Sequence, residues 1–288
     1  MLKRRFLRTV PKCEGRYLNL FNKCAEYESE LDKDFGQFTL EEYYTHIKNM
    51  AYKTYPSIES MINLYKKYID WYILKIEKTD RKNTIKEIDI CSVLNRKYVA
   101  REKLIEELSC IPNARERFAI LATYEGIGVR DKKVVAYITF NHVNHYSNYI
   151  SYFDDKYYVS DELMEIINDA EDETEVFNFS DLNTKHKLKD SSYIFKPSFN
   201  SVRERSLKSR MDIIYRGIRN GLDITNSLKD FTLRDIIESG RINYILTESK
   251  KLNLTPREFV KRNKNNIEYL YGTFQPYLLF KEYANYIN

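Results

Sequence analysis

The scarcity of glycine and proline is the property that most constrains how this chain can fold. Its 288 residues include only 8 glycines and 6 prolines, and 43% of them are hydrophobic. Because glycine and proline mark turns and interrupt helices, their scarcity, together with many Lys, Glu, Ile and Leu residues, favours helices. A chain of this length and apolar content can bury one large core or two modest ones, and long disordered tracts are not expected.

The N-terminal part of the chain predicts a basic arm and then a helical bundle. Residues 1–37 are interpreted as a basic, partly helical arm, since MLKRRFLR contains four cations and no acid. Residues 38–111 predict a compact domain of four helices. The first begins with a capping-box pattern, Thr39 followed by Glu42, and ends at a turn before Pro56. The others are expected to begin at Ser57 and to lie around residues 88–95 and 99–110.

The segment Ile111-Pro112-Asn113 is the best candidate for a domain boundary, so residues 112–288 form a second expected domain. β-branched and aromatic stretches separated by polar turns predict a small antiparallel sheet there, within a mainly helical (α+β) fold. The expected strands are Val134–Phe140, Tyr149–Phe153 and Lys156–Val159. The expected helices are 114–124, 161–168, 201–220, 232–239, 241–251 and 255–262.

Charge and cysteine usage restrict the class of protein. A net charge of +5 and a pI near 8.7 permit nucleic-acid binding without requiring it. The acidic run 169–175 is expected to be an exposed loop. The four cysteines show no short pairing, no signal peptide or membrane-spanning run is recognised, and we expect reduced structural thiols in a cytoplasmic protein.

A segment after the expected helix 114–124 carries the most specific motif. The string TYEGIGVRDKKV, Thr123–Val134, resembles the tyrosine-recombinase segment in which Thr-Gly-Leu-Arg follows a hydrophobic helix. Two N-terminal strings, KDFGQFTLEEYYTHI and SIESMINLYKKYIDWYI, resemble the SAM-like core-binding domain of phage integrases. The order and spacing of these parts resemble that family over roughly residues 20–280. The resemblance implies a core-binding domain and a catalytic-type domain that together clamp duplex DNA.

The resemblance also indicates which catalytic groups the chain lacks. The first family arginine falls on Gly128, with Arg130 as a displaced substitute, and the first residue of the His-x-x-Arg box is Phe231. Two guanidiniums normally bind the scissile phosphate, and a general acid protonates the leaving oxygen. The chain is therefore expected to have no catalytic residues and no recombination chemistry. The degenerate family positions are Gly128, Lys156, Phe231, Arg234, Arg262 and Tyr271, the last of which stands where the nucleophile belongs.

A recombinase fold that has lost its chemistry but kept its clamp implies a DNA-binding regulator. The chain resembles the recombinase-fold master repressors of SPbeta-like Bacillus prophages, which implies a nucleoid-associated repressor in lysis–lysogeny control. Its expected partners are double-stranded operator DNA and a small phage or host regulatory protein, with no membrane and no cofactor. Candidate DNA-binding residues are Lys66, Lys67, Arg96, Lys97, Arg101, Arg130, Arg203, Arg205, Lys208, Arg210, Arg216 and Arg234.

Other interpretations of the same residues stay open. An active integrase would need Arg130 to replace the missing arginine and Tyr271 to act as nucleophile, so both would have to converge with Arg234. A protein-interaction module without DNA binding is the second alternative. His142 and His145 have a spacing that suits a metal, but no Cys or carboxylate pattern accompanies them, so no metal site is expected.

Overall fold

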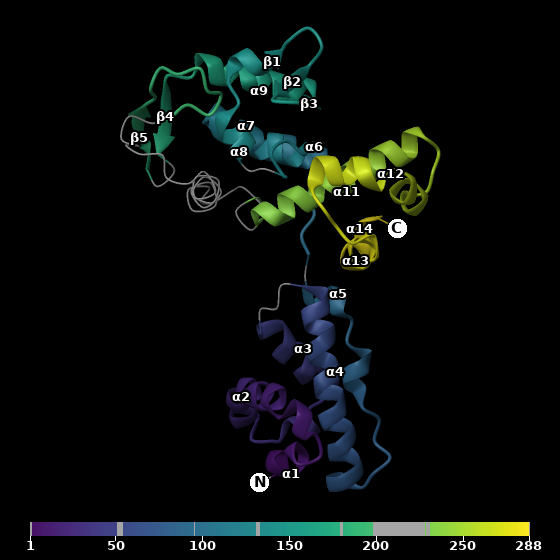
Figure 1. Ribbon diagram of the computed structural model, residues 1–288. Helices are drawn as coiled ribbons and strands as arrows, with labels where there is room; N and C mark the ends of the chain where they lie inside the picture. Colours follow the sequence, from purple (N-terminus) through teal and green to yellow (C-terminus); the bar gives the residue numbers. More distant parts are fainter. Residues whose placement is uncertain are drawn as a thin grey trace. The chain divides into compact units, whose positions relative to one another are not determined.

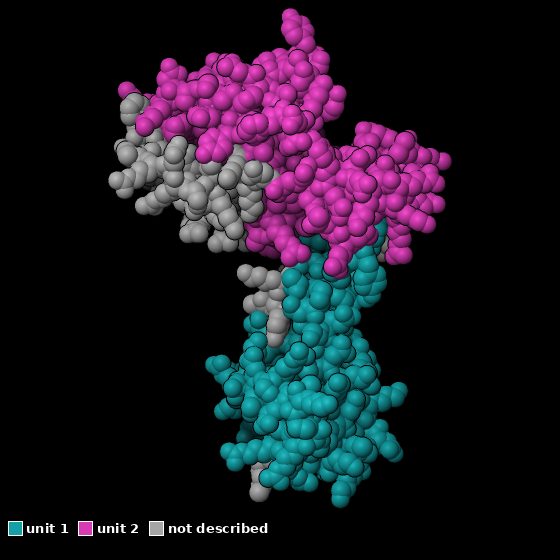
Figure 2. All heavy atoms as spheres, viewed as in Figure 1, with its two compact units in different colours: residues 1–96, 277–284 teal, residues 97–276, 285–288 magenta. Residues whose placement is uncertain are grey.

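The computed structural model divides the chain into two compact units, which Figure 2 colours separately. The first comprises residues 1–96 and 277–284, and the second 97–276 and 285–288. The sequence suggests a boundary at Ile111–Asn113, whereas the units divide between Arg96 and Lys97. The helix before Pro112 buries Leu104 and Leu108 in the second core, and this burial assigns it to the second unit. The structure describes residues 2–50, 54–94, 96–130, 133–178, 181–197, 228 and 231–287.

The described part of the first unit contains helices and loops only (Figure 1). Its core is rich in aromatic side chains from α2, α3 and α4. The elements are α1 Leu2–Leu7, η1 Pro11–Cys13, α2 Glu14–Leu31, η2 Phe35–Gln37, α3 Leu40–Asn49, α4 Tyr55–Tyr72, η3 Ile73–Glu77, η4 Thr84–Glu87, α5 Ile90–Leu94 and α13 Pro276–Glu282.

The expected basic arm is part of this core. Phe6 of α1 is buried, and its ring lies 5.2 Å from the ring of Tyr68 on α4. On α2, Tyr17 and Phe21 are buried on the same helix face. Their spacing of four residues is typical of an amphipathic helix, and burying that face places residues 2–31 within the first unit.

A side-chain capping box marks the start of α3, whereas α4 begins without a side-chain cap hydrogen bond. Thr39 accepts the Glu42 N–H at 3.3 Å and Glu42 accepts the Thr39 N–H at 2.7 Å, which confirms the predicted capping box. The α4 prediction was wrong in detail, because the helix begins at Tyr55 with Thr54 as its N-cap. Pro56 lies in the first turn, where its missing N–H leaves no helical hydrogen bond unmade.

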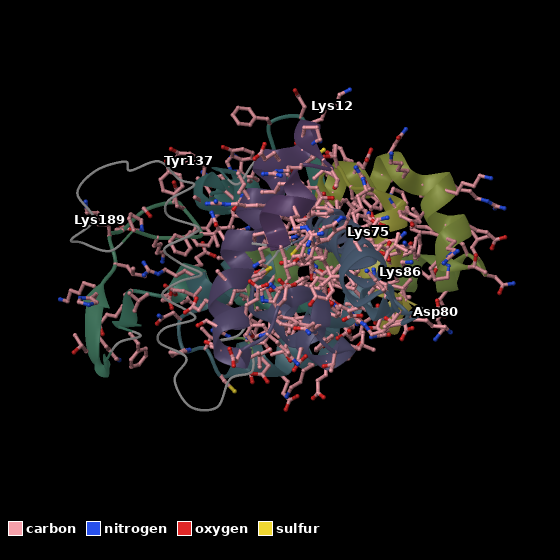
Figure 3. All side chains as sticks on the ribbon, turned by 90° about the horizontal axis from the view of Figure 1, so that it is seen from below. Lys12, Lys75, Asp80, Lys86, Tyr137 and Lys189 are labelled. Carbon is pink, nitrogen blue, oxygen red and sulfur yellow. The ribbon has the colours of Figure 1, made fainter. Side chains whose placement is uncertain are left out.

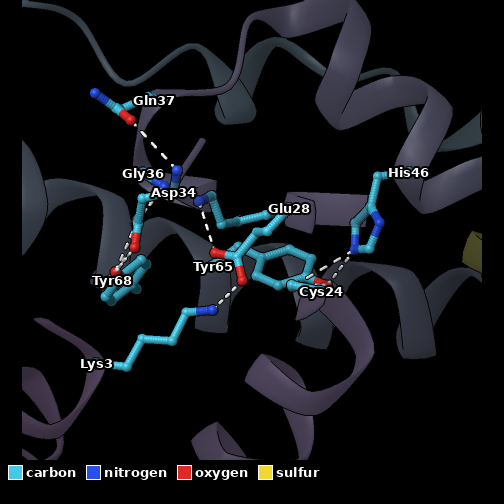
Figure 4. Close-up of polar contacts among 10 residues, drawn as sticks. Lys3, Cys24, Glu28, Asp34, Gly36, Gln37, His46, Tyr65 and Tyr68 are labelled. Atoms are coloured by element: carbon cyan, nitrogen blue, oxygen red, sulfur yellow. Dashed lines mark hydrogen bonds and ion pairs between the residues drawn. The ribbon is translucent and has the colours of Figure 1, made fainter. Parts of the chain in front are cut away.

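Buried polar groups of the first unit bond to one another (Figure 4). The Tyr65 hydroxyl lies 2.9 Å from Nε2 of His46 and accepts the Cys24 thiol at 3.3 Å. Burial lowers the pKa of His46 to about 4 and raises the pKa of Cys24 to about 12. Both groups are therefore neutral at pH 7. All four cysteines are free, and among them Cys24 is buried and Cys110 is exposed.

Residues from the end of the chain complete the first unit. Glu282 accepts the Tyr55 N–H at 3.2 Å and pairs with Arg96 at 2.8 Å. The Cys91 thiol donates to the Lys281 carbonyl at 2.7 Å. These contacts tie α13 to the beginning of α4 and to the last residues before the second unit.

The second unit is built around α7, which packs against α9 and α11 (Figure 1). Most residues of α7 are buried, so the helix is covered by other elements around most of its circumference. The elements are α6 Arg101–Ser109, α7 Ala114–Tyr124, α8 Lys133–Tyr137, η5 Phe140–His142, β1 Val143–Asn144, β2 Tyr149–Tyr152, β3 Asp155–Tyr158, α9 Asp161–Asp172, β4 Glu175–Asn178, β5 Asp181–Lys187, α11 Leu233–Lys251, α12 Pro256–Tyr271 and α14 Ala284–Ile287.

A three-stranded antiparallel sheet confirms two of the three predicted strands. Its order is β1-β2-β3, and Ile150 pairs with Tyr157 on the buried face. The expected strand Val134–Phe140 was wrong, because its first part is the helix α8. Val135 is only 1% exposed there, and the Ile138 N–H donates to the Val134 carbonyl at 2.9 Å. Burial of this short apolar run in the second core overrides its β propensity.

Gly240 lies inside one continuous helix, although the sequence suggests two helices that meet there. A Cβ at Gly240 would lie 1.9 Å from the Tyr124 carbonyl oxygen. Glycine is therefore required for the close approach of α11 to α7 and not for a break in α11.

Among the described helices, none is both long enough and apolar enough to cross a membrane.

Candidate nucleic-acid interface

The loop after α7 contains Gly128, the residue that the sequence analysis aligns with the first family arginine. Gly126 and Gly128 have φ angles of +89° and +71°, a backbone region that suits glycine. Gly128 is buried and, being glycine, has no side chain that could contact a ligand. Arg130, two residues later, is exposed, and its guanidinium lies 5.1 Å from the centre of the Tyr269 ring.

The β2–β3 hairpin lies next to the same tyrosine. The Tyr269 hydroxyl donates to Asp155 at 2.5 Å, and this hydrogen bond raises the pKa of Tyr269. The neighbouring Lys156 is exposed, with its ammonium 3.7 Å from the centre of the Tyr149 ring. Arg130 lies over the Tyr269 ring, which bonds to Asp155, whereas Lys156 lies over Tyr149 on the other face of the hairpin, because adjacent strand residues point to opposite faces.

Tyr271, which the sequence analysis aligns with the family nucleophile, lies in the interior. It is the last residue of α12, it is 4% exposed, and its hydroxyl donates to the Tyr124 carbonyl at 3.1 Å. Burial raises the pKa of this phenol. Arg241 donates to the Tyr271 carbonyl at 2.5 Å. These contacts hold the end of α12 against α7 and α11.

The first turn of α11 contains Arg234, which the sequence analysis aligns with the second family arginine. Thr232 caps the helix through a reciprocal bond with Asp235, and Arg234 is exposed in the turn that follows. Phe231, at the position of the family histidine, is half-buried and packs against the second core. The Lys97 ammonium lies 5.9 Å from the centre of its ring. Arg262 is exposed on α12.

Two of the predicted DNA-binding arginines have acidic partners within the protein. Arg101 pairs with Glu162 at 2.7 Å and with Glu125 at 3.5 Å. Its hydrogen bonds to Glu162 lower the pKa of that carboxyl to about 2. The Arg96 side chain is only 10% exposed, beside a Glu282 side chain that is 5% exposed. The sequence did not predict these partners, since the acids lie far along the chain.

The remaining predicted cations are only partly described. On α4, Lys67 is exposed and Lys66 is half-buried. The exposed side chains that follow α4, among them Lys75, Asp80 and Lys86 in Figure 3, mix both signs of charge. Because basic and acidic side chains are mixed there, the segment after α4 does not form a purely basic surface. The helix expected at 201–220 lies outside the described residues, as do Arg203, Arg205, Lys208, Arg210 and Arg216.

The sequence did not predict the hydrogen bond between Tyr269 and Asp155, which joins α12 to the β2–β3 hairpin. Tyr269 and Asp155 are 114 positions apart, and no local pattern joins them.

His142, considered above as a metal ligand, accepts the Thr139 N–H at 3.0 Å. Within the described ranges, no three His, Cys, Asp or Glu side chains group as metal ligands.

The architecture defines a tyrosine-recombinase-like protein with a helical core-binding unit and a catalytic-type unit. The model of the MrpR N-terminal core-binding domain matches residues 1–75, and that of the MrpR C-terminal catalytic domain matches residues 98–273. The chain belongs to the MrpR family, which confirms the predicted fold class and family. A search of curated proteins finds no significant match.

Proposed function

We propose that the protein is a sequence-specific DNA-binding repressor of phage or prophage transcription, built on a recombinase-like fold without recombination chemistry. The observation that carries this proposal is the environment of Tyr271. Its hydroxyl is buried and donates to a backbone carbonyl, whereas a nucleophile must present its oxygen to the phosphate. The fold uses this phenol to join α12 to α7.

The groups around the expected phosphate support the same proposal. Strand transfer by a tyrosine requires two preorganised guanidiniums and a proton donor for the leaving oxygen. Gly128 is buried and supplies no cation, and the half-buried Phe231 has no proton to give. Losing these groups together removes most of the transition-state stabilisation that such enzymes need.

DNA binding does not depend on those groups. Phosphate contacts require exposed cations, which position a protein on the duplex, and base contacts then supply specificity. Arg130, Lys156, Arg234 and Arg262 are exposed on the second unit, and Lys67 on the first. In this proposal Arg234 binds a phosphate without contributing to its cleavage. A core-binding domain of the MrpR family supports a DNA partner.

Two measurements on one selected duplex test the proposal. Duplexes bound by the full chain are first selected from the protein's own genome, and fluorescence anisotropy then follows binding as salt increases. About five phosphate contacts give a log–log salt slope near −4 to −5. We expect Arg234→Ala to weaken binding and to reduce the slope by about one. Tyr271→Phe should keep its affinity within about tenfold of wild type.

The second measurement uses the same duplex with a nick that traps covalent phosphotyrosine. We expect no adduct. Tyr269 is included as a control because its hydroxyl is close to Arg130 at the surface. An adduct that disappears in Tyr269→Phe or Tyr271→Phe would establish an active recombinase instead. Equal affinity for every duplex, or a flat salt response, would exclude a specific repressor.

A further inference from the structure

The turn between β2 and β3 contains Phe153 at a backbone conformation that bulky residues rarely adopt. Tyr152 pairs with Asp155, so Phe153 and Asp154 are the two residues of the turn. Phe153 has a φ of +52°, a region in which bulky side chains are rare. In two-residue hairpins a positive φ at the first position usually belongs to glycine or asparagine.

Phe153 is also exposed, so burial does not account for it. Its side chain is 87% exposed, and its ring packs edge-on against Tyr152 at 4.7 Å. By contrast, the neighbouring turn uses Asn148 at its own positive φ of +44°. Stability alone would favour asparagine or glycine at position 153. A bulky residue that keeps a strained backbone position without burial to stabilise it points to a functional constraint, and for an exposed aromatic ring that function would be binding.

Hydrogen bonds anchor the hairpin next to its turn. Asp155 accepts the Tyr269 hydroxyl at 2.5 Å and the Tyr157 hydroxyl at 3.2 Å. The first of these bonds joins the hairpin to α12. The Phe153 ring is therefore presented by a short two-residue turn on an anchored strand pair, and ordering it on binding loses little conformational entropy.

The charges beside the hairpin suit nucleic acid. Lys156 lies over the Tyr149 ring, and Arg130 lies over the Tyr269 ring that anchors the hairpin. Both cations are exposed, and at the tip itself Asp154 is an exposed acid. A rigid apolar ring with cations near its base matches the chemistry of proteins that bind phosphates while inserting a side chain between bases.

We infer that Phe153 is a wedge that enters the minor groove of bound duplex DNA and partly unstacks one base step. The inference rests on the proposed DNA-binding function and adds a mechanism of recognition to it. Pyrimidine–purine steps such as TA are the easiest to unstack. The wedge would therefore favour binding sites with an easily deformed base step at the point of insertion, without a hydrogen bond to the bases there.

The test uses the full chain and a duplex selected as described for the repressor proposal. Each adenine in turn is replaced by 2-aminopurine, whose fluorescence rises when the base is unstacked, and anisotropy is recorded on the same samples. We expect a several-fold fluorescence rise at one step with wild type. Phe153→Ala and Phe153→Asn should lose at least three quarters of that rise and keep affinity within about tenfold. Leu74→Ala removes another exposed apolar side chain, 64% exposed, and should behave as wild type.

A thermal melt separates the wedge from a packing role. Phe153→Asn should melt at or above the wild-type temperature, because asparagine tolerates the positive φ better. Specific binding without a fluorescence rise at any adenine overturns the inference and leaves the repressor proposal standing. A rise that persists in Phe153→Ala, or a clear loss of melting temperature in Phe153→Asn, also overturns it. Absence of DNA binding overturns both proposals.

Discussion

Replacing Gly240 by alanine should destabilise the second unit strongly. The added Cβ would lie 1.9 Å from the Tyr124 carbonyl oxygen, where ordinary van der Waals contact begins at 3.4 Å. The obstacle is backbone on both sides, so α11 must move away from α7 by about 1.5 Å. Overpacking of this kind typically costs about 1–3 kcal/mol.

The displacement also strains hydrogen bonds that depend on the same helix contact. Ser239 accepts the Val99 N–H at 3.1 Å, and Tyr271 donates to the Tyr124 carbonyl at 3.1 Å. Each such bond contributes about 0.5–1.5 kcal/mol net. We therefore expect Gly240→Ala to lower the free energy of unfolding of the second unit by roughly 3–5 kcal/mol. For a unit of this size the melting temperature should fall by about 10 °C.

Gly15→Ala is the matched control. Gly15 lies in α2, and a Cβ there would meet no atom within 4 Å. The same substitution should leave the second unit unchanged and stabilise the first by up to about 1 kcal/mol, through helix propensity. Differential scanning calorimetry and urea unfolding followed by circular dichroism measure both variants. A Gly240→Ala protein that unfolds within about 1 kcal/mol of wild type would refute the close α7–α11 approach.

Three further substitutions have definite expected outcomes. Tyr271→Phe should lower the unfolding free energy of the second unit by only about 0.5–1.5 kcal/mol in a urea titration, and a larger loss would mean that the hydroxyl has further partners. Glu282→Gln removes the carboxylate charge beside the nearly buried Arg96 and weakens a charge-assisted hydrogen bond, which should lower the unfolding free energy of the first unit by about 1.5–3 kcal/mol; no change would refute the tight packing of α13. Burial raises the pKa of Glu116 from 4.5 to about 7, so its stabilising contribution is complete below pH 4.5 and is lost as pH rises through 7. Urea titrations between pH 5 and 8 should show a flatter profile for Glu116→Gln, and parallel profiles would contradict the raised pKa.

Features that depend on near neighbours in the chain were predictable from the sequence. The Thr39–Glu42 capping box, the strands at Tyr149 and Lys156 and most of the helices follow from spacings of two to four residues. The family was predicted from the order of such segments and is confirmed by the matching MrpR domains, whereas the alignment of Gly128 and Phe231 with catalytic positions stays a prediction. Residues that interact along one helix or strand lie within a few positions of each other, so these patterns could be read directly.

The arrangement of the candidate interface was decided by the tertiary structure. Val134–Tyr137 is helical because it packs in the second core. Beyond Arg262, α12 resumes after a kink at Asn263, whose side-chain amide donates to the Phe259 carbonyl at 3.1 Å. The burial of Tyr271 depends on Tyr124, which lies 147 residues away. The ion pairs of Arg96 and Arg101 likewise join groups that are 24–186 residues apart. Whether a tyrosine is buried or a cation is paired depends on which surfaces meet when the chain folds, and no local spacing encodes that.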